Sequence, residues 1–228
     1  HKMDTPFKEI LSLDLYQLLK PCQSLFKLSK MKQPDLENFV GIHNRKYCDG
    51  GQCIRLYKTF MKKKDPEAAN IVMGHNEEDL LGLGTIFSLL AYKKLYDGEY
   101  HPKQCVILEQ ELKIVIELSA AAPVNVSCGN SDFYLSVNGY EARMLVHLKE
   151  GKLRQYYRNY KDYEFIPGED TAMPKSITRY MDKSLKIATT PQTCYTWFNC
   201  DEDFLNNEKK QMQYLTHTLP FFLDNLNK

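Results

Sequence analysis

The spacing of apolar residues changes near residue 98, and this change limits the folds open to the 228-residue chain. Before it, apolar residues recur at three- and four-residue intervals, as in DLYQLLKPCQSLFKL, which indicates helices. From Cys105 onward, apolar and polar residues alternate in short runs such as LKIVIEL and FYLSV, which indicates strands. Asp97-Gly98 and Pro102 supply the breaks between the two patterns. We therefore expect an α+β protein with two domains: a mostly helical one at residues 1–100 and a β-rich one, with a few helices, at residues 101–228.

Capping and helix-breaking residues predict where the helices of the first half begin and end. Asp14 is placed to cap the first helix, and Pro21 is expected to interrupt it. Asp65-Pro66 is a strong start for a helix that we expect to end near Met73. Gly74 would separate it from the longest helix, His75 to Tyr96, whose many apolar residues predict burial on most sides.

Two glycines inside this longest helix predict a close contact. Gly82 and Gly84 each cost about 1 kcal/mol of helix stability relative to alanine. We expect another backbone to pack closely at these positions.

The second half contains two dipeptides that are typical of hairpin turns, Asn138-Gly139 and Glu150-Gly151. Together they predict a meander of antiparallel strands. We expect a short helix within MPKSITRYMDKSL, a last strand at TCYTWF and helical or irregular structure in residues 207–226. Trp197, the chain's one tryptophan, is expected to fill the core of this half.

Composition is that of an ordinary globular protein, with 43% apolar residues, 26% charged residues and a net charge of +1. The charge is unevenly distributed, because residues 1–64 hold 13 lysines and arginines against 6 acids, whereas residues 65–79 hold five acids and no lysine or arginine. A cationic segment beside an acidic one suits an enzyme acting on a polyanion, and it also suits plain surface charge. No membrane span or signal peptide is visible, and the seven cysteines lack metal-site spacing. We expect a cytoplasmic protein with reduced thiols.

A histidine and a carboxylate one helical turn apart are the best candidates for chemistry. In GHNEEDLLGL, His75 and Asp79 project from one face of the expected helix. The carboxylate can hold a divalent ion, and the imidazole can take a proton from a water that the ion activates. Glu77 and Glu78 point to other faces, where first-turn acids are favoured by the helix dipole. The alternative reading is a capping histidine beside a surface acid.

The run from Phe39 to Leu83 resembles the YprB-like family of RNase H-like exonucleases. Its markers are a short helix ending in Val40-Gly41-Ile42, a Gly-Gly loop, Tyr57, and the motif His75-Asn76-x-x-Asp79; SLDLYQLLK also fits. The resemblance covers about residues 10–96 and implies the later helices of an RNase H-like core. It further implies that four acids hold two Mg²⁺ or Mn²⁺ ions, with Asp79 as the last ligand and His75 orienting or deprotonating the attacking water.

The chain departs from the family pattern at its start. The first acidic motif, Asp-x-Glu, is absent, and MDTPF differs from the Phe-Asp-x-Pro setting of the second because Asp4 precedes threonine. We therefore expect the chain to begin just after the second motif and to be inactive alone, since one carboxylate and one histidine cannot hold two ions.

Aromatic and basic residues alternate in RQYYRNYKDYEF, at positions 154–165. Such stretches can bind single-stranded nucleic acid by stacking bases and pairing with phosphates. The candidate residues are Arg154, Tyr156, Tyr157, Arg158, Tyr160 and Lys161. The alternative is a pair of edge strands with half-buried tyrosines, because strands favour aromatic residues.

These features support two functions of different classes. The first is part of a metal-dependent 3′–5′ exonuclease that hydrolyses DNA or RNA with two ions. The second is a non-catalytic nucleic-acid-binding or assembly module whose β-rich half makes the interaction. A third option is that this half only packs against the nuclease core or mediates dimerisation. The choice between DNA and RNA, and the oligomeric state, stay open.

Overall fold

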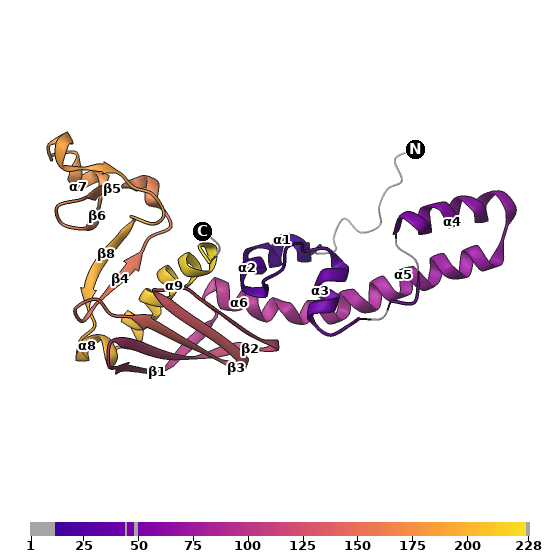
Figure 1. Cartoon of the computed structure of the whole chain (residues 1–228), viewed down its shortest axis with the longest axis horizontal. Coiled ribbons are helices and arrows are strands. Elements are labelled where there is room, and N and C mark those ends of the chain that lie inside the picture. Colours follow the sequence, from indigo (N-terminus) through magenta and orange to yellow (C-terminus); the bar gives the residue numbers. More distant parts are fainter. Residues whose placement is uncertain (1–11, 44, 48–49, 227–228) are drawn as a thin grey trace.

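The computed structural model describes residues 12–43, 45–47 and 50–226. Helices occupy the chain up to Asp97, and strands dominate from Tyr100 onward. The predicted α+β class and the change of structure near residue 98 are confirmed. Figure 1 shows an elongated molecule, with a helical arm at one end and the sheets at the other.

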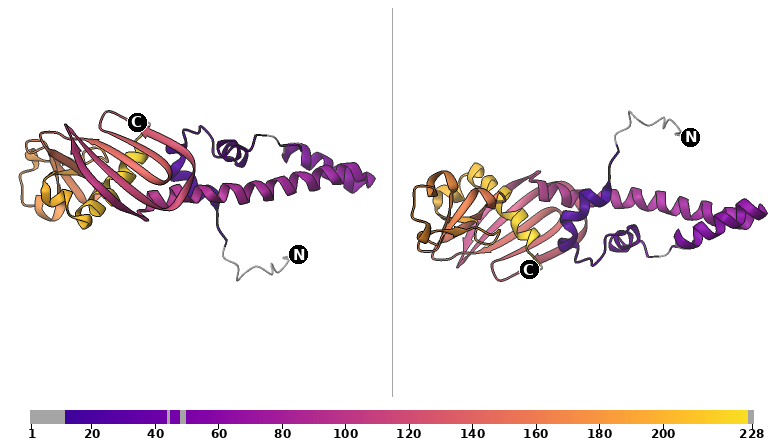
Figure 2. Two further views of the ribbon diagram at one scale, coloured as in Figure 1. Left: turned by 90° about the horizontal axis from the view of Figure 1, so that it is seen from below. Right: turned by 90° about the horizontal axis from the view of Figure 1, so that it is seen from above.

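Four short helical segments begin the described chain: α1 (Leu15–Leu19), η1 (Lys20–Cys22), α2 (Gln23–Phe26) and α3 (Gln33–Phe39). The Asp14 carboxylate accepts the amide of Gln17 at 3.2 Å and caps α1, as predicted. Pro21 lies in the 3-10 turn η1, where a full α-helical hydrogen-bond pattern is interrupted, which is also as predicted. These segments pack beside the long helix described next (Figure 2).

The arm is an antiparallel pair of helices, α4 (Gly50–Lys63) and α5 (Pro66–Ile86). Asp65 caps α5 and Pro66 is in its first turn, as predicted. The predicted break at Gly74 is wrong, because α5 continues through it without interruption. A glycine costs a helix only about 1 kcal/mol, and here the Tyr47 ring packs where a Cβ would otherwise lie. His75 is therefore inside a helix and not at its start.

The long helix continues through η2 (Phe87–Leu89) into α6 (Leu90–Asp97). Its predicted burial is wrong for the segment before Ile86. Leu80 and Leu81 are 65% and 68% exposed, whereas Ile86 and Leu89 are buried. Before Ile86 the buried residues of α5 are the small ones Ala68, Gly74 and Gly82, so the large side chains of Leu80 and Leu81 are open to solvent on the arm. None of the described helices is long and apolar enough to cross a membrane.

The main sheet has three antiparallel strands in the order β1 (Tyr100–Leu108), β2 (Glu111–Gly129) and β3 (Phe133–His147). A straight strand as long as β3 would span about 50 Å, yet the His147 amide donates to the Asp132 carbonyl at 2.9 Å. The β2–β3 pair therefore doubles back on itself. Gly139 has a φ of +55°, pairs with Ala122 at a register shift and lies close to the midpoint between Asp132 and His147, so the chain reverses at the turn predicted at Asn138-Gly139, although β3 runs through it as one strand.

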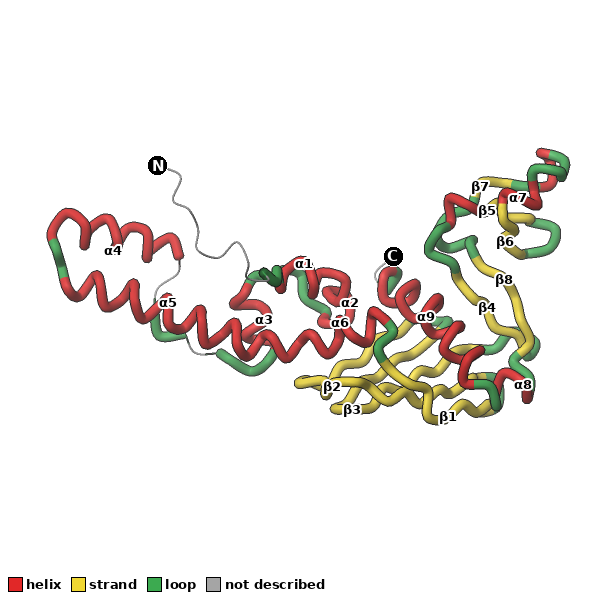
Figure 3. The backbone as a smooth tube through the Cα atoms, turned by 180° about the vertical axis from the view of Figure 1, so that it is seen from behind, coloured by secondary structure: helices red, strands yellow, loops and turns green. Residues whose placement is uncertain are grey.

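Two smaller sheets follow the main one. The turn predicted at Glu150-Gly151 is confirmed, since both residues have positive φ and Lys149 bridges to Lys152. The strands are β4 (Lys152–Tyr156) with β8 (Tyr195–Asn199), and β5 (Tyr163–Ile166) with β6 (Thr171–Pro174) and β7 (Ile187–Ala188). The helical segments are η3 (Tyr160–Asp162), α7 (Lys175–Thr178), η4 (Lys183–Leu185), α8 (Glu202–Leu205) and α9 (Glu208–Asp224). Figure 3 shows that the sheet containing β5 lies away from the main sheet.

One hydrophobic cluster joins both halves of the chain. It contains Leu19 and Leu25 from the first helices, Ile114 and Met144 from the main sheet, and Leu219 from α9. Along β2, Leu112 to Leu118 alternate buried and exposed, so one face of the sheet is covered. Trp197 is only partly buried and packs at the edge of this cluster. The division at residue 100 stays a prediction.

Candidate acidic site on the long helix

His75 and Asp79 lie one turn apart on α5, on one face, as their spacing predicts. His75 Nε2 is 3.5 Å from Asp79 Oδ2, and the two side chains are 14% and 35% exposed. His75 Nδ1 is buried and has no hydrogen-bond partner among the described residues. The pair is therefore in contact, with one side of the carboxylate open to other groups.

Arg45 connects Asp79 to a second carboxylate, and we call Glu37, Arg45 and Asp79 the Arg45 bridge. The guanidinium donates from Nη1 to Asp79 Oδ1 at 2.7 Å. It also donates from Nε and Nη2 to the two Glu37 oxygens, each at 2.7 Å. This fork is the strong bidentate form of an arginine–carboxylate pair. One cation therefore holds two acids from α3 and α5 together.

Gln33 and Gly82 complete the contact between α3 and α5. Gln33 Nε2 donates to Glu37 Oε1 and to the Asp79 carbonyl, each at 2.8 Å. A Cβ at Gly82 would lie 1.9 Å from Glu37 Oε1, so only glycine leaves room for the carboxylate. The prediction of a close approach holds at Gly82, although a side chain and not a backbone makes it. At Gly84 it is wrong, because no atom from another part of the described chain lies within 4 Å of the position that a Cβ would take.

The pairing fixes the charges of the bridge. Hydrogen bonds from Arg45 lower the pKa of Glu37, although burial opposes the shift. Hydrogen bonding to Glu37 in turn raises the pKa of Arg45. Glu37, which is only 2% exposed, is therefore an ionised acid inside the contact, compensated by the guanidinium.

Glu77 and Glu78, the acids beside Asp79 on α5, are not at the start of a helix as predicted. Because α5 begins at Pro66, Glu77 and Glu78 are not in a first turn, and the helix dipole does not explain them. Glu78 instead accepts the backbone amides of Lys46 at 2.8 Å and Tyr47 at 3.3 Å. This acid ties the segment that carries Arg45 to the long helix.

The described side chains do not by themselves fit a pair of divalent ions. Within the described ranges, no group of three or more His, Cys, Asp or Glu side chains is arranged to hold a metal. The guanidinium of Arg45, a permanent cation, already lies between Glu37 and Asp79. Asp4, the acid of the MDTPF stretch, lies outside the described residues.

Sequence reasoning missed Glu37 and Arg45. Arg45 contacts Asp79 34 positions away in the chain, and no local pattern marks such a pair. The one signal in the sequence was Gly82, because a glycine lowers helix stability and therefore indicates a close contact. It did not show which residue makes that contact.

The predicted nucleic-acid-binding residues are divided among several surroundings. Tyr156 is buried and stacked on Phe221, with ring centroids 3.7 Å apart. The Tyr157 hydroxyl is 2.9 Å from Thr196 Oγ1, and Arg158 contacts the Tyr96 hydroxyl and pairs with Asp224 at 3.5 Å. The buried position of Tyr156 agrees with the alternative interpretation, in which these tyrosines belong to strands and are partly buried.

The remaining three candidates lie at surface hollows. The guanidinium of Arg154 packs over the rings of Tyr195 and Trp197. Tyr160 and Lys161 line a groove, which we call the lysine groove. Its further members include Tyr163, Glu164, Lys175, Lys183, Lys186 and Ile187.

Comparison with known proteins connects the acidic site to one superfamily. Residues 1–91 match the RNase H superfamily. The matched part contains Glu37, Arg45, His75 and Asp79, and it supports an RNase H-like domain over these residues. No curated protein and no solved structure matches the chain.

Proposed function

We propose that this chain is part of a 3′–5′ exonuclease of the YprB-like family that hydrolyses phosphodiester bonds in DNA or RNA. The observation that carries the proposal is the contact between His75 and Asp79, at 3.5 Å, inside the matched RNase H-like segment. A carboxylate and an imidazole in contact can bind a metal ion and transfer protons in hydrolysis.

The proposed cofactor is Mg²⁺ or Mn²⁺, with two ions. Asp79 is the one described ligand that we assign, and further carboxylates have to come from outside the described residues. Arg45 is a positioning residue in this proposal, because its 2.7 Å bond to Oδ1 fixes the orientation of the Asp79 carboxylate. We therefore expect the described residues alone to be inactive, and we place the protein in the cytoplasm.

The test is cleavage of a 5′-labelled oligonucleotide by the full-length protein, with and without Mg²⁺ or Mn²⁺. We expect metal-dependent shortening from the 3′ end, and loss of at least 100-fold in rate on Asp79→Asn. Glu77→Gln is the matched control, because this acid is exposed on the same helix. A rate for Asp79→Asn within a few-fold of the unchanged protein contradicts the assignment.

The lysine groove favours a second function, the binding of single-stranded nucleic acid without chemistry. Lys161, Lys175, Lys183 and Lys186 line it with Tyr160 and Tyr163, and Glu164 is its one acid among the described lining residues. That acid is already paired with Lys186 at 2.9 Å. A cationic groove with aromatic rings is the usual surface for a sequence-independent single strand.

The second function is tested by the anisotropy of a labelled single strand titrated with the whole chain. We expect binding that weakens steeply with salt, because phosphate contacts release counterions. The double variant Lys161→Glu and Lys183→Glu should weaken binding at least tenfold. The control is Lys62→Glu with Lys63→Glu, an equal charge change at the end of α4. Equal weakening in both variants contradicts a site at the groove.

A further inference from the structure

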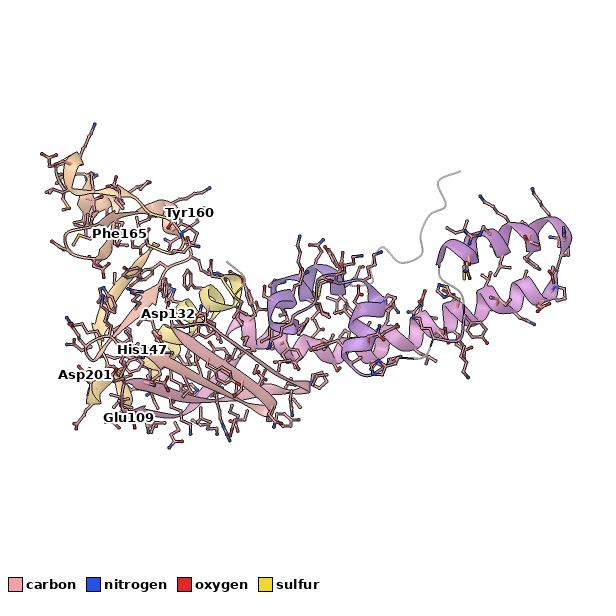
Figure 4. All side chains as sticks on the ribbon, in the orientation of Figure 1. Glu109, Asp132, His147, Tyr160, Phe165 and Asp201 are labelled. Carbon is pink, nitrogen blue, oxygen red and sulfur yellow. The ribbon has the colours of Figure 1, made fainter. Side chains whose placement is uncertain are left out.

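A small pocket lies where the two ends of β3 meet β4, β8 and α9. We call it the Trp197 pocket; its volume is about 280 Å³. Its polar lining includes Asp132, His147, Lys149 and Arg154, and its apolar lining includes Trp197 and Phe222. Figure 4 labels Asp132 and His147 side by side at this end of the main sheet, far along the molecule from the arm that carries Asp79. The pocket is thus separate from the acidic site.

Arg154 is held in an unusual way on the wall of this pocket. Its guanidinium carbon is 4.6 Å from the Tyr195 ring centroid and 4.7 Å from that of Trp197. Its Nε is buried and has no hydrogen-bond partner, and no carboxylate in the described chain forms an ion pair with it. The guanidinium does hydrogen-bond with Tyr156, and Asp170 interacts with it at longer range. Because partly buried charges are normally paired with an opposite charge in contact, this cation still has room for an anion that comes from outside.

Asp170, the acid that contacts the two aromatic rings, is already engaged. Asp170 accepts the Tyr195 hydroxyl at 2.6 Å, and its carbonyl accepts Trp197 Nε1 at 2.9 Å. These bonds hold the two rings in place and turn the carboxylate toward them. The aromatic support of Arg154 is therefore fixed before any ligand binds.

Two other side chains, one cationic and one acidic, give the pocket an uneven distribution of charge. Lys149 Nζ lies 5.4 Å from the Trp197 ring centroid and adds a second cation. Asp132 adds an acceptor that would repel a simple anion but would accept N–H groups of a base. The volume is near the lower end of the range of about 300–1,000 Å³ for small-molecule sites, so it suits one nucleotide and not a strand.

We propose that the Trp197 pocket binds a nucleoside monophosphate. Arg154 and Lys149 take the phosphate, the apolar wall of Trp197 and Phe222 contacts the planar base, and Asp132 accepts a base N–H. The proposal does not depend on Asp79 or on cleavage. The pocket proposal can therefore fail while the nuclease proposal stands, and the nuclease proposal can fail while the pocket proposal stands.

The experiment uses the intrinsic fluorescence of Trp197, which is the chain's one tryptophan and therefore reports directly on the pocket. The whole chain is titrated separately with the four common nucleoside monophosphates, with adenosine and with inorganic phosphate. We expect a saturable change with at least one monophosphate, and at least tenfold weaker binding of adenosine and of phosphate. No saturable change with any monophosphate overturns the proposal, and so does phosphate binding as tightly as the nucleotides.

Variants separate the pocket from a general effect of charge. Arg154→Met is expected to weaken binding at least tenfold, and Lys149→Met, at an exposed position, should weaken it as well without affecting the fold. Arg143→Met is the control, because this arginine is exposed on β3 and pairs with Glu141 at 2.5 Å, outside the pocket. Unchanged affinity in Lys149→Met, or an equal loss in Arg143→Met, contradicts the proposed site.

Discussion

Replacing Gly82 by alanine should break the contact between α3 and α5, whereas the same change at Gly84 should not. At Gly82 the new Cβ would lie 1.9 Å from Glu37 Oε1, and an ordinary contact needs about 3.4 Å. The carboxylate would have to move by roughly 1.5 Å, which is incompatible with its two 2.7 Å bonds to Arg45. At Gly84 a Cβ would have no atom of another described segment within 4 Å.

The expected magnitudes follow from the charges. Glu37 is 2% exposed, and an uncompensated buried charge costs about 3–5 kcal/mol. Alanine is better than glycine in a helix by about 1 kcal/mol. Gly82→Ala should therefore lower the free energy of unfolding of this segment by about 2–4 kcal/mol. Gly84→Ala should raise it by up to about 1 kcal/mol.

Urea unfolding followed by circular dichroism at 222 nm measures both variants, and amide hydrogen exchange in α3 and α5 localises the change. The double variant with Glu37→Ala provides a thermodynamic cycle. Without the carboxylate, Gly82→Ala should become neutral or stabilising, because its steric conflict is gone. If Gly82→Ala is as stable as Gly84→Ala in the unchanged background, the Arg45 bridge does not hold the two helices together.

Three further predictions concern charge and packing. Because Arg45 lowers the pKa of Glu37, the stability that this acid contributes is present above its ordinary pKa of 4.5 and is lost as the pH falls below it; acid titration of unfolding should show a shallower loss for Glu37→Gln. Arg45→Met should destabilise the protein by about 3 kcal/mol at pH 7, measured in urea, since it leaves Glu37 unpaired; an effect below about 1 kcal/mol contradicts this reasoning. Tyr156→Ala should cost about 3 kcal/mol through lost stacking on Phe221, and the exposed Tyr134→Ala much less, by thermal unfolding.

The features that sequence predicted correctly are local ones. The change from helices to strands near residue 98 follows from two different spacings of apolar residues, each visible within a few positions. The caps at Asp14 and Asp65 depend on residues within three positions of each other. The contact of His75 with Asp79 likewise needs only the helical repeat, so its geometry could be predicted although its place within the helix was not.

The features that sequence missed depend on partners distant in the chain. Gly74 was expected to end a helix, but packing of Tyr47 against it outweighs a cost of about 1 kcal/mol. Arg45 bonds Asp79 across 34 positions and so joins it to Glu37, which is 42 positions from Asp79 in the chain. The sequence around each of these three residues contains no pattern that points to the other two. Leu80 and Leu81 were expected to be buried because apolar stripes usually are, yet they are 65% and 68% exposed.

The shared hydrophobic cluster has a consequence for any attempt to divide the protein in two. Leu19 and Leu25, near the start of the described chain, belong to the same cluster as Leu219, near its end. The strands β2 and β3, which lie between them in the sequence, contribute to this cluster as well. Cutting the chain after residue 100 would leave each fragment with half of a common interior exposed to water. Such fragments should be insoluble when produced separately and should recover a native spectrum only when refolded together.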